Sequence, residues 1–408
     1  MSELSVRAAV AGEYDEVRVL FAGAMMFDSS PTELGRRMFE PERTLVVTDG
    51  PDIVGTTQAL TRDLSVPGAV VPAAHVTGVG VKATHRRRGI MSELISRQLR
   101  EVPEAIAVLW ASESGIYGRF GYAAAAWGMS YDIDLHRVGP SNVKARPGEV
   151  SELPADGAVK ELAPLLQALQ ERRPGVSGRS DLKWQQHLED KPEDRGGKTA
   201  RQILVHRDAT GAIDGYALWR GKMHWIATGP ANEVHLEELV ALSPAAYRAL
   251  WQHLLTLDLA GTLEFGFAAV DEPIQQLVTT PTALNRRVNE SLWVRVTDVP
   301  RALEQRRYAV PVDLVLDITD DLIPTNTGRF RLTAEAPTVD GSAARCEPTD
   351  SPADLSLSTT ELGATYLGGR QLAEFAATGR VTEHTPGALS RASAAFGWPI
   401  APVSLEIF

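Results

Sequence analysis

The first place where residue types and spacing suggest chemistry is a basic turn that runs directly into a helix pattern. Arg86, Arg87, Arg88 and Gly89 form the turn, and the apolar face of the following helix carries Met91, Leu94, Ile95 and Leu99. Backbone N–H groups at the start of a helix act with the helix dipole to bind phosphate. Arg side chains add charge for a diphosphate, and a glycine lets the ligand approach the backbone. The alternative is a solvated basic turn ahead of an ordinary amphipathic helix.

A second cluster, rich in glycine and aromatic residues, follows the next expected strand at 106–111. It includes Tyr117 and ends in Gly118-Arg119-Phe120-Gly121-Tyr122. Tyr117 and Tyr122 are the phenol groups of this cluster, and a phenol can donate a proton or a hydrogen bond. Packing in the core is the alternative role for both.

The elements that must position these candidates can be read from periodicity. Apolar residues at helical spacing occupy 17–25, and a strand at 44–48 is followed by a turn and a return strand from Ile53. A further strand at 75–81 leads into the basic turn. The predicted order is helix, hairpin, strand, basic loop, helix and strand, so both chemical clusters follow strands.

The same order returns in the middle of the chain. Strands are expected at 203–206, 215–219 and 234–242, and Ser243 and Pro244 are typical of a helix N-terminus. The pattern indicates a diverged structural repeat without a basic loop. Beyond residue 295, apolar and polar residues alternate at 312–318, 329–334 and 355–357, as in strands buried on one face.

Bulk properties restrict the class of protein. The chain has 408 residues, 44% of them hydrophobic and 23% charged, and a formal charge of −11, which disfavours a nucleic-acid partner. The single cysteine excludes an intramolecular disulfide, and no HExxH or Cys/His cluster suggests a metal. We expect no secretory signal and no membrane helix, since Pro and Gly break the longest uncharged run at 66–81. A cytoplasmic protein is predicted.

The basic loop resembles the Arg/Gln-x-x-Gly-x-Gly/Ala diphosphate loop of the GCN5-related N-acetyltransferases, with Met91 where Gly or Ala is usual. The segment 118–122 is similar to that of the enhanced intracellular survival (Eis) acetyltransferases, and 326–332 and 366–370 look like sterol-carrier signatures. The resemblance implies an α+β chain with two tandem GNAT-like mixed-sheet domains, followed by a sterol-carrier-protein-like α/β domain. The implied ranges are 1–140 (catalytic), 141–294 (degenerate) and 295–408, with the linker 139–142 at the first boundary.

The resemblance also implies roles for individual residues. Tyr122 would be the general acid, with Tyr117 as the nearby competitor, and Phe408 would supply its main-chain carboxylate as general base. A phenol, with a pKa of about 10, can donate a proton to a departing thiolate, whose conjugate acid has a pKa of about 8.5. The chain ends on apolar residues, which independently suggests a docked terminus. Acetyl-CoA would be held by Val79, Val81, Arg86, Arg87, Arg88, Gly89 and Ile90.

The implied reaction is direct acetyl transfer to primary amines of polyamines such as aminoglycosides, or to lysine side chains, by a homo-hexamer built from trimers. No metal, nucleic acid or membrane takes part in it. Asp28 and Glu33 could line the pocket for a polycationic amine, with solvent exposure as their alternative. A function of another class is a non-catalytic lipid- or acyl-CoA-binding protein that uses the sterol-carrier-like segment. For that segment, a structural lid is favoured over lipid transport.

Overall fold

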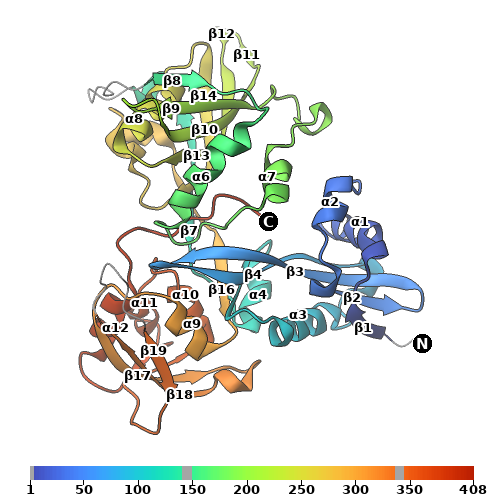
Figure 1. The fold of residues 1–408 in the computed structure, drawn as a ribbon, viewed down its shortest axis with the longest axis vertical. Helices are drawn as coiled ribbons and strands as arrows, with labels where there is room; N and C mark the ends of the chain where they lie inside the picture. The colour runs from blue at the N-terminus through green and yellow to red at the C-terminus, as the bar shows by residue number, and fades with distance from the viewer. Residues whose placement is uncertain (1–3, 140–148, 336–343) are drawn as a thin grey trace. The chain divides into compact units, whose positions relative to one another are not determined.

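The computed structural model describes residues 4–139, 149–335 and 344–408, which form two compact units (Figure 1). The first unit comprises Met1–Ala126, Leu292–Pro399 and Ile407–Phe408, and the second comprises Trp127–Ser291 and Ile400–Glu406. Most of the linker expected at 139–142 lies outside the described residues.

The first unit contains a seven-stranded mixed sheet of order β1-β2-β3-β4-β5-β16-β6. Its strands are β1 Leu4–Ala8, β2 Thr44–Asp49, β3 Asp52–Val66, β4 Ala69–Val81, β5 Ile106–Trp110, β6 Ala123–Ala124 and β16 Leu292–Val296. The predicted hairpin and strands are confirmed. Most of the uncharged run at 66–81 belongs to strand β4.

Alternation along these strands places a helix on each face of the sheet (Figure 1). Val46 and Ile53 pack with Val17 and Leu20 of α1 (Tyr14–Ala24). Leu45, Val47 and Val54 pack with Ile90 and Leu94 of α3 (Ile90–Glu101). A short helix α2 (Glu33–Met38) follows α1, and α4 (Ser114–Tyr117) follows β5.

The segment 299–396 of the first unit adds a five-stranded sheet of order β19-β18-β17-β20-β21. Its elements are β17 Val312–Thr319, β18 Gly328–Ala334, β19 Arg345–Pro348, β20 Leu355–Ser358, β21 Thr382–Glu383, α9 Val299–Gln305, α10 Thr359–Thr365, α11 Leu372–Ala376 and α12 Ala388–Phe396. One apolar core joins this sheet to β5 and β16. A Cβ added to Gly363 of α10 would lie 2.7 Å from the carbonyl oxygen of Val294, so the close packing of α10 on β16 requires glycine.

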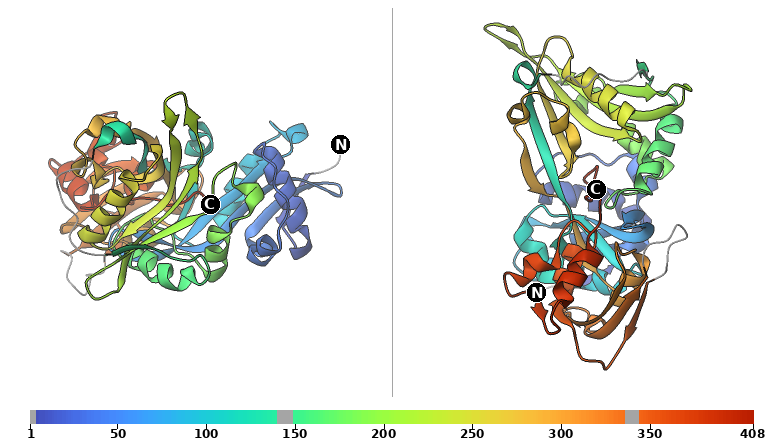
Figure 2. Two further views of the ribbon diagram at one scale, coloured as in Figure 1. Left: turned by 90° about the horizontal axis from the view of Figure 1, so that it is seen from above. Right: turned by 90° about the vertical axis from the view of Figure 1, so that its left-hand side faces the viewer.

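The second unit repeats the architecture with a sheet of order β15-β7-β14-β13-β10-β9-β8. Figure 2 shows the ribbon from two further sides. Its elements are β7 Trp127–Asp134, α5 Leu135–Val138, β8 Glu149–Glu152, α6 Ala158–Gln170, α7 Asp181–Leu188, β9 Gln202–Arg207, β10 Ile213–Lys222, β13 Asn232–Ala241, α8 Pro244–Leu255, β14 Ala260–Ala269 and β15 Arg287–Glu290, with the small hairpin β11 Trp225–Ile226 and β12 Gly229–Pro230. As expected, the Ser243 hydroxyl caps α8 by accepting from the Ala246 N–H.

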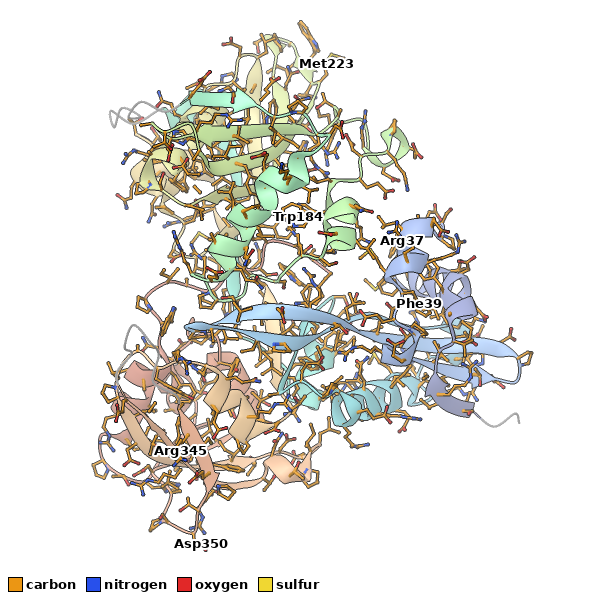
Figure 3. The ribbon with its side chains drawn as sticks, in the orientation of Figure 1. Arg37, Phe39, Trp184, Met223, Arg345 and Asp350 are labelled. Atoms are coloured by element: carbon orange, nitrogen blue, oxygen red, sulfur yellow. The ribbon has the colours of Figure 1, made fainter. Side chains whose placement is uncertain are left out.

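The two faces of this second sheet are covered by different helices. Leu204 and Ala217 pack under α8, whereas their neighbours Ile203, Val205 and Leu218 pack under α6. Trp184 of α7, labelled in Figure 3, joins the α6 side and is buried. The expected structural repeat is therefore present.

Two strands pair in a sheet that their place in the sequence does not indicate. β7 precedes residue 140 yet pairs with β14 and β15 of the second sheet. β16 begins at Leu292 yet lies between β5 and β6 of the first sheet. Each sheet therefore contains one strand whose position in the sequence falls outside the range expected for its domain (1–140 or 141–294).

Candidate functional site

The candidate site is built where two parallel strands of the first sheet separate. β4 pairs with β5 only at Ala74–Ala107 and His75–Val108. Beyond His75, β4 keeps only its antiparallel partner β3, while β5 stays paired with β16. We call this divergence of the two strands the opening, and the far end of β4 leads into the basic loop.

The basic loop has the backbone conformation that an anion site needs. A 3₁₀ turn at Ala83–His85 is followed by positive φ values of 60° at Arg87 and 80° at Gly89. Gly89 then caps α3 without a side chain, and the Glu93 N–H is the first N–H of the helix to bond, to the Gly89 carbonyl. In the described part of the chain, no acceptor is recorded for the N–H groups of residues 86–92. They are available to a diphosphate, and the helix dipole assists.

The reason for a glycine at residue 89 is conformational. A Cβ added there would meet nothing within 4 Å, so the protein itself leaves room for a side chain. Its φ of 80° is the left-handed region in which other residues are strained.

The three arginine side chains remain at the surface around this loop. Arg86 donates to the Ala24 carbonyl at 3.3 Å, and Arg88 lies 3.7 Å from the Asp49 carboxylate. His85 also lies near Asp49, with 3.1 Å between its Nε2 and a carboxylate oxygen. All three arginines are exposed, so a ligand can reach their guanidinium groups.

The other predicted cofactor residues can contribute only backbone groups or shape. Val79 lies in a bulge of β4 opposite β3, beside Gly78 with φ of 62°. Val81 pairs with Gly55 of β3. Ile90 buries its side chain under the sheet, so it offers its N–H at the start of α3.

Tyr122 is fully buried and has no hydrogen-bond partner for its hydroxyl among the described residues. Its ring meets that of Tyr117 at a centroid distance of 6.0 Å, in an edge-to-face arrangement. Burial raises the pKa of Tyr122 well above its usual range, and the positive charge of Arg295 opposes that effect in part. The phenol therefore keeps its proton at all physiological pH values, as a general acid must.

Tyr117, the competing candidate, is in a different state. It hydrogen-bonds to Ser112, and its pKa is raised mainly by burial. Its hydroxyl therefore has a structural partner, whereas that of Tyr122 does not.

Phe408 docks against the strand from which the opening begins. Its ring lies 4.6 Å from that of His75, centroid to centroid, and the guanidinium carbon of Arg62 lies 5.8 Å from the ring centre. His75 is buried, and its Nδ1 lies 2.9 Å from the Ala73 carbonyl oxygen. The expected docking of the chain terminus is confirmed. Sequence reasoning missed His75 and Arg62, because nothing local marks a strand residue as the partner of a residue more than 300 positions away.

The two predicted acidic residues, Asp28 and Glu33, lie at the protein surface. Asp28 and Glu33 are exposed, and Glu33 makes only a surface ion pair of 3.6 Å with Arg36 of its own helix. Glu33 is the first residue of α2 and Asp28 lies before that helix, and both are solvated charges.

The opening does not recur as a diphosphate site in the second sheet. Its strand β13 leads into α8 through Ser243 and Pro244. Pro244 has no N–H, and the Ser243 hydroxyl already occupies one of the free N–H groups of α8. The second repeat therefore lacks the donors that the first one offers.

Comparison with known proteins agrees with this geometry. Acetyltransferase (GNAT) domain families match residues 5–125 and 175–296, and a sterol carrier protein domain family matches 299–404. The chain is 39% identical to an uncharacterized N-acetyltransferase of Streptomyces avermitilis, over 95% of both chains. It is 31% identical to the N-acetyltransferase Eis of Mycobacterium tuberculosis, over 87% of this chain and 88% of that protein. The chain belongs to the Eis family of GCN5-related N-acetyltransferases. The crystal structure of Eis1 from Mycobacterium abscessus superposes with a TM-score of 0.84 at 30% identity, covering 99% of this chain and all of that one.

This Eis-family chain is therefore an N-acetyltransferase with two tandem GNAT domains and a sterol-carrier-like domain. Within residues 4–139, 149–335 and 344–408, no cluster of three or more potential metal ligands occurs. No helix in that part of the chain is long and apolar enough to cross a membrane.

The sterol-carrier-like domain is packed around a buried arginine. The Arg306 guanidinium donates to the carbonyl oxygens of Thr365, Tyr366 and Phe396, and it lies 4.9 Å from the ring centres of both Tyr308 and Phe396. The charge of this buried guanidinium is stabilised by the carbonyl oxygens and the aromatic faces around it.

Proposed function

We propose that this protein transfers the acetyl group of acetyl-CoA directly to primary amines of polycationic substrates such as aminoglycosides, with lysine side chains as a second class of acceptor. The observation that carries the proposal is the opening between β4 and β5, because the N–H groups of residues 86–92 lie beyond it at the start of α3. The formal charge of −11 favours a cationic acceptor.

Each step of the proposed reaction uses a group of this chain. The main-chain carboxylate of Phe408 accepts a proton from the attacking amine, whose nitrogen forms a bond to the thioester carbonyl carbon. As the C–S bond breaks, Tyr122 donates its phenolic proton to the departing thiolate. A carboxylate is a weak base, so its contribution depends on being held beside the amine and on stabilising its positive charge.

The remaining expectations about the family extend the proposal. We infer a homo-hexamer built from trimers that works in the cytoplasm without a metal ion. Asp28 and Glu33 are too exposed to form an amine pocket by themselves, so they would act only as long-range attraction for a cation.

The diphosphate site is tested by charge removal on the loop. The variants Arg87→Gln and Arg88→Gln should each raise the KM for acetyl-CoA roughly ten- to hundredfold, since a charge-assisted hydrogen bond contributes about 1.5–3 kcal/mol. The matched control is Arg100→Gln, which changes an exposed arginine at the other end of α3 and should leave KM unchanged. An unchanged KM in both loop variants would contradict the proposed site.

The base is tested separately by adding two residues after Phe408. The extension moves the carboxylate away and should lower kcat about 100-fold or more, with the KM for acetyl-CoA retained. The same two residues added before Met1 provide the control. Full activity of the C-terminally extended protein would remove Phe408 from the mechanism.

A further inference from the structure

The second sheet opens between parallel strands in the same way as the first. β13 and β14 pair from Asn232–Ala260 to Leu236–Phe265. Beyond that, β13 continues beside β10 to Ala241, whereas the end of β14 pairs only with β7. The opening lies entirely within the second unit.

This opening holds a cavity of about 590 Å³, which we call the β13–β14 pocket. That volume is within the range of about 300–1,000 Å³ typical of small-molecule sites. Most of its wall is apolar, and includes Leu239, Phe265, Phe267, Leu277, Val403 and Leu405. Such a wall suits a hydrocarbon chain.

Most polar groups on the wall already have partners. Tyr247 donates its hydroxyl proton to Glu272, and burial raises the pKa of the Glu272 carboxyl. Arg173 forms an ion pair with Asp271. The Ser243 hydroxyl donates to Asp214 while it caps α8. None of these groups requires a ligand.

Arg248 is the exception. It lines the pocket from α8, and among the described residues its guanidinium has no carboxylate partner. A cation that borders an apolar cavity without a counter-charge is a position at which an anionic group of a ligand can pair. Carboxylates are the acceptors that best match the guanidinium group.

The pocket cannot take the diphosphate of coenzyme A as the first sheet would. Pro244 removes one N–H at the start of α8, and the Ser243 hydroxyl occupies that of Ala246. The remaining cation at the wall, one guanidinium, matches a single negative charge better than two phosphates.

We propose that the β13–β14 pocket binds a linear monocarboxylate with a hydrocarbon tail, whose carboxylate pairs with Arg248 and whose tail lies against Leu239 and Phe267. The GNAT-like domain without a diphosphate loop is then a ligand-binding domain in its own right. The inference stands apart from the acetyl-transfer chemistry, because every residue in it lies in the second unit.

Isothermal titration calorimetry with decanoate, below its micelle concentration and on the full chain, tests the proposal. Decanoate should bind the unmodified protein with a stoichiometry of one per chain. Arg248→Met should weaken binding at least tenfold, and Leu239→Trp, which fills the cavity, should abolish it. The unfolding temperature of each variant and its acetyltransferase rate confirm that the fold is intact.

Two controls separate the pocket from general adsorption. Arg137→Met changes an exposed arginine of the same unit outside the pocket, and should leave decanoate affinity unchanged. Decylamine, with the same tail and the opposite charge, should not bind. The proposal is overturned if decanoate does not bind, if both pocket variants bind it as well as the unmodified protein, or if decylamine binds equally well.

Discussion

Replacing Tyr122 by phenylalanine separates catalysis from stability more sharply than any other change in this protein. The side chain is wholly buried, and its hydroxyl has no partner in the described structure. Removing the oxygen breaks no hydrogen bond and leaves the ring contact with Tyr117 in place.

Tyr122→Phe should lower the catalytic rate without lowering the thermal stability. A general acid contributes about 10²–10⁴ in rate, so kcat should fall by that factor, or about 3–5 kcal/mol in the barrier. A buried hydroxyl without a partner destabilises the fold, so Tyr122→Phe should unfold at the same or a higher temperature. In contrast, Tyr117→Phe removes the hydrogen bond to Ser112 and should cost about 0.5–1.5 kcal/mol, with little change in kcat.

The assay measures release of the CoA thiol at saturating amine while acetyl-CoA is varied, together with thermal unfolding. The KM for acetyl-CoA should stay within about twofold of its original value, since Tyr122 is outside the diphosphate loop. A kcat within twofold of the unmodified protein would refute the reasoning and move the acid role to Tyr117 or to water. A large loss of thermal stability would show that the hydroxyl is bonded after all.

Three further predictions concern buried ionisable side chains. Arg295→Met should lower the free energy of unfolding in urea by about 3–5 kcal/mol, because it leaves the buried Asp320 carboxylate without its counter-charge. Both oxygens of that carboxylate lie 2.7 Å from the arginine Nη2. A loss under about 1 kcal/mol would argue against the ion pair. Burial lowers the pKa of His187 to about 4. As the pH falls below about 6.5, this histidine therefore takes up a proton in the unfolded chain before it does so in the folded chain. The free energy of unfolding should drop by on the order of 3 kcal/mol by about pH 4. His187→Gln should remove that part of the acid sensitivity, and an unchanged pH profile would contradict the assignment. Burial raises the pKa of Cys346 to about 12, so this single thiol should be inert to thiol reagents at pH 8 and react only after unfolding; rapid labelling of the folded protein would disprove this.

Local patterns were sufficient to predict the elements themselves. The hairpin with a strand at 44–48 and a return strand from Ile53, the capped helix after Ser243 and the alternating strands beyond residue 312 all occur as expected. Periodicity and capping act within a few residues. The basic loop was also recognisable, since residues 86–92 are contiguous and their helix-start geometry is local.

Only the tertiary structure decided which strand joins which sheet and which side chains meet. β7 and β16 exchange sheets because strand pairing depends on partners far along the chain, which periodicity does not encode. The contact of Phe408 with His75 and the enclosure of Arg306 by three carbonyls likewise arise from segments that are distant in sequence. The sequence by itself determined which helix or strand each segment forms, because backbone conformational preferences depend on neighbouring residues. Burial of apolar surface between distant segments determined where the charged and aromatic groups come together.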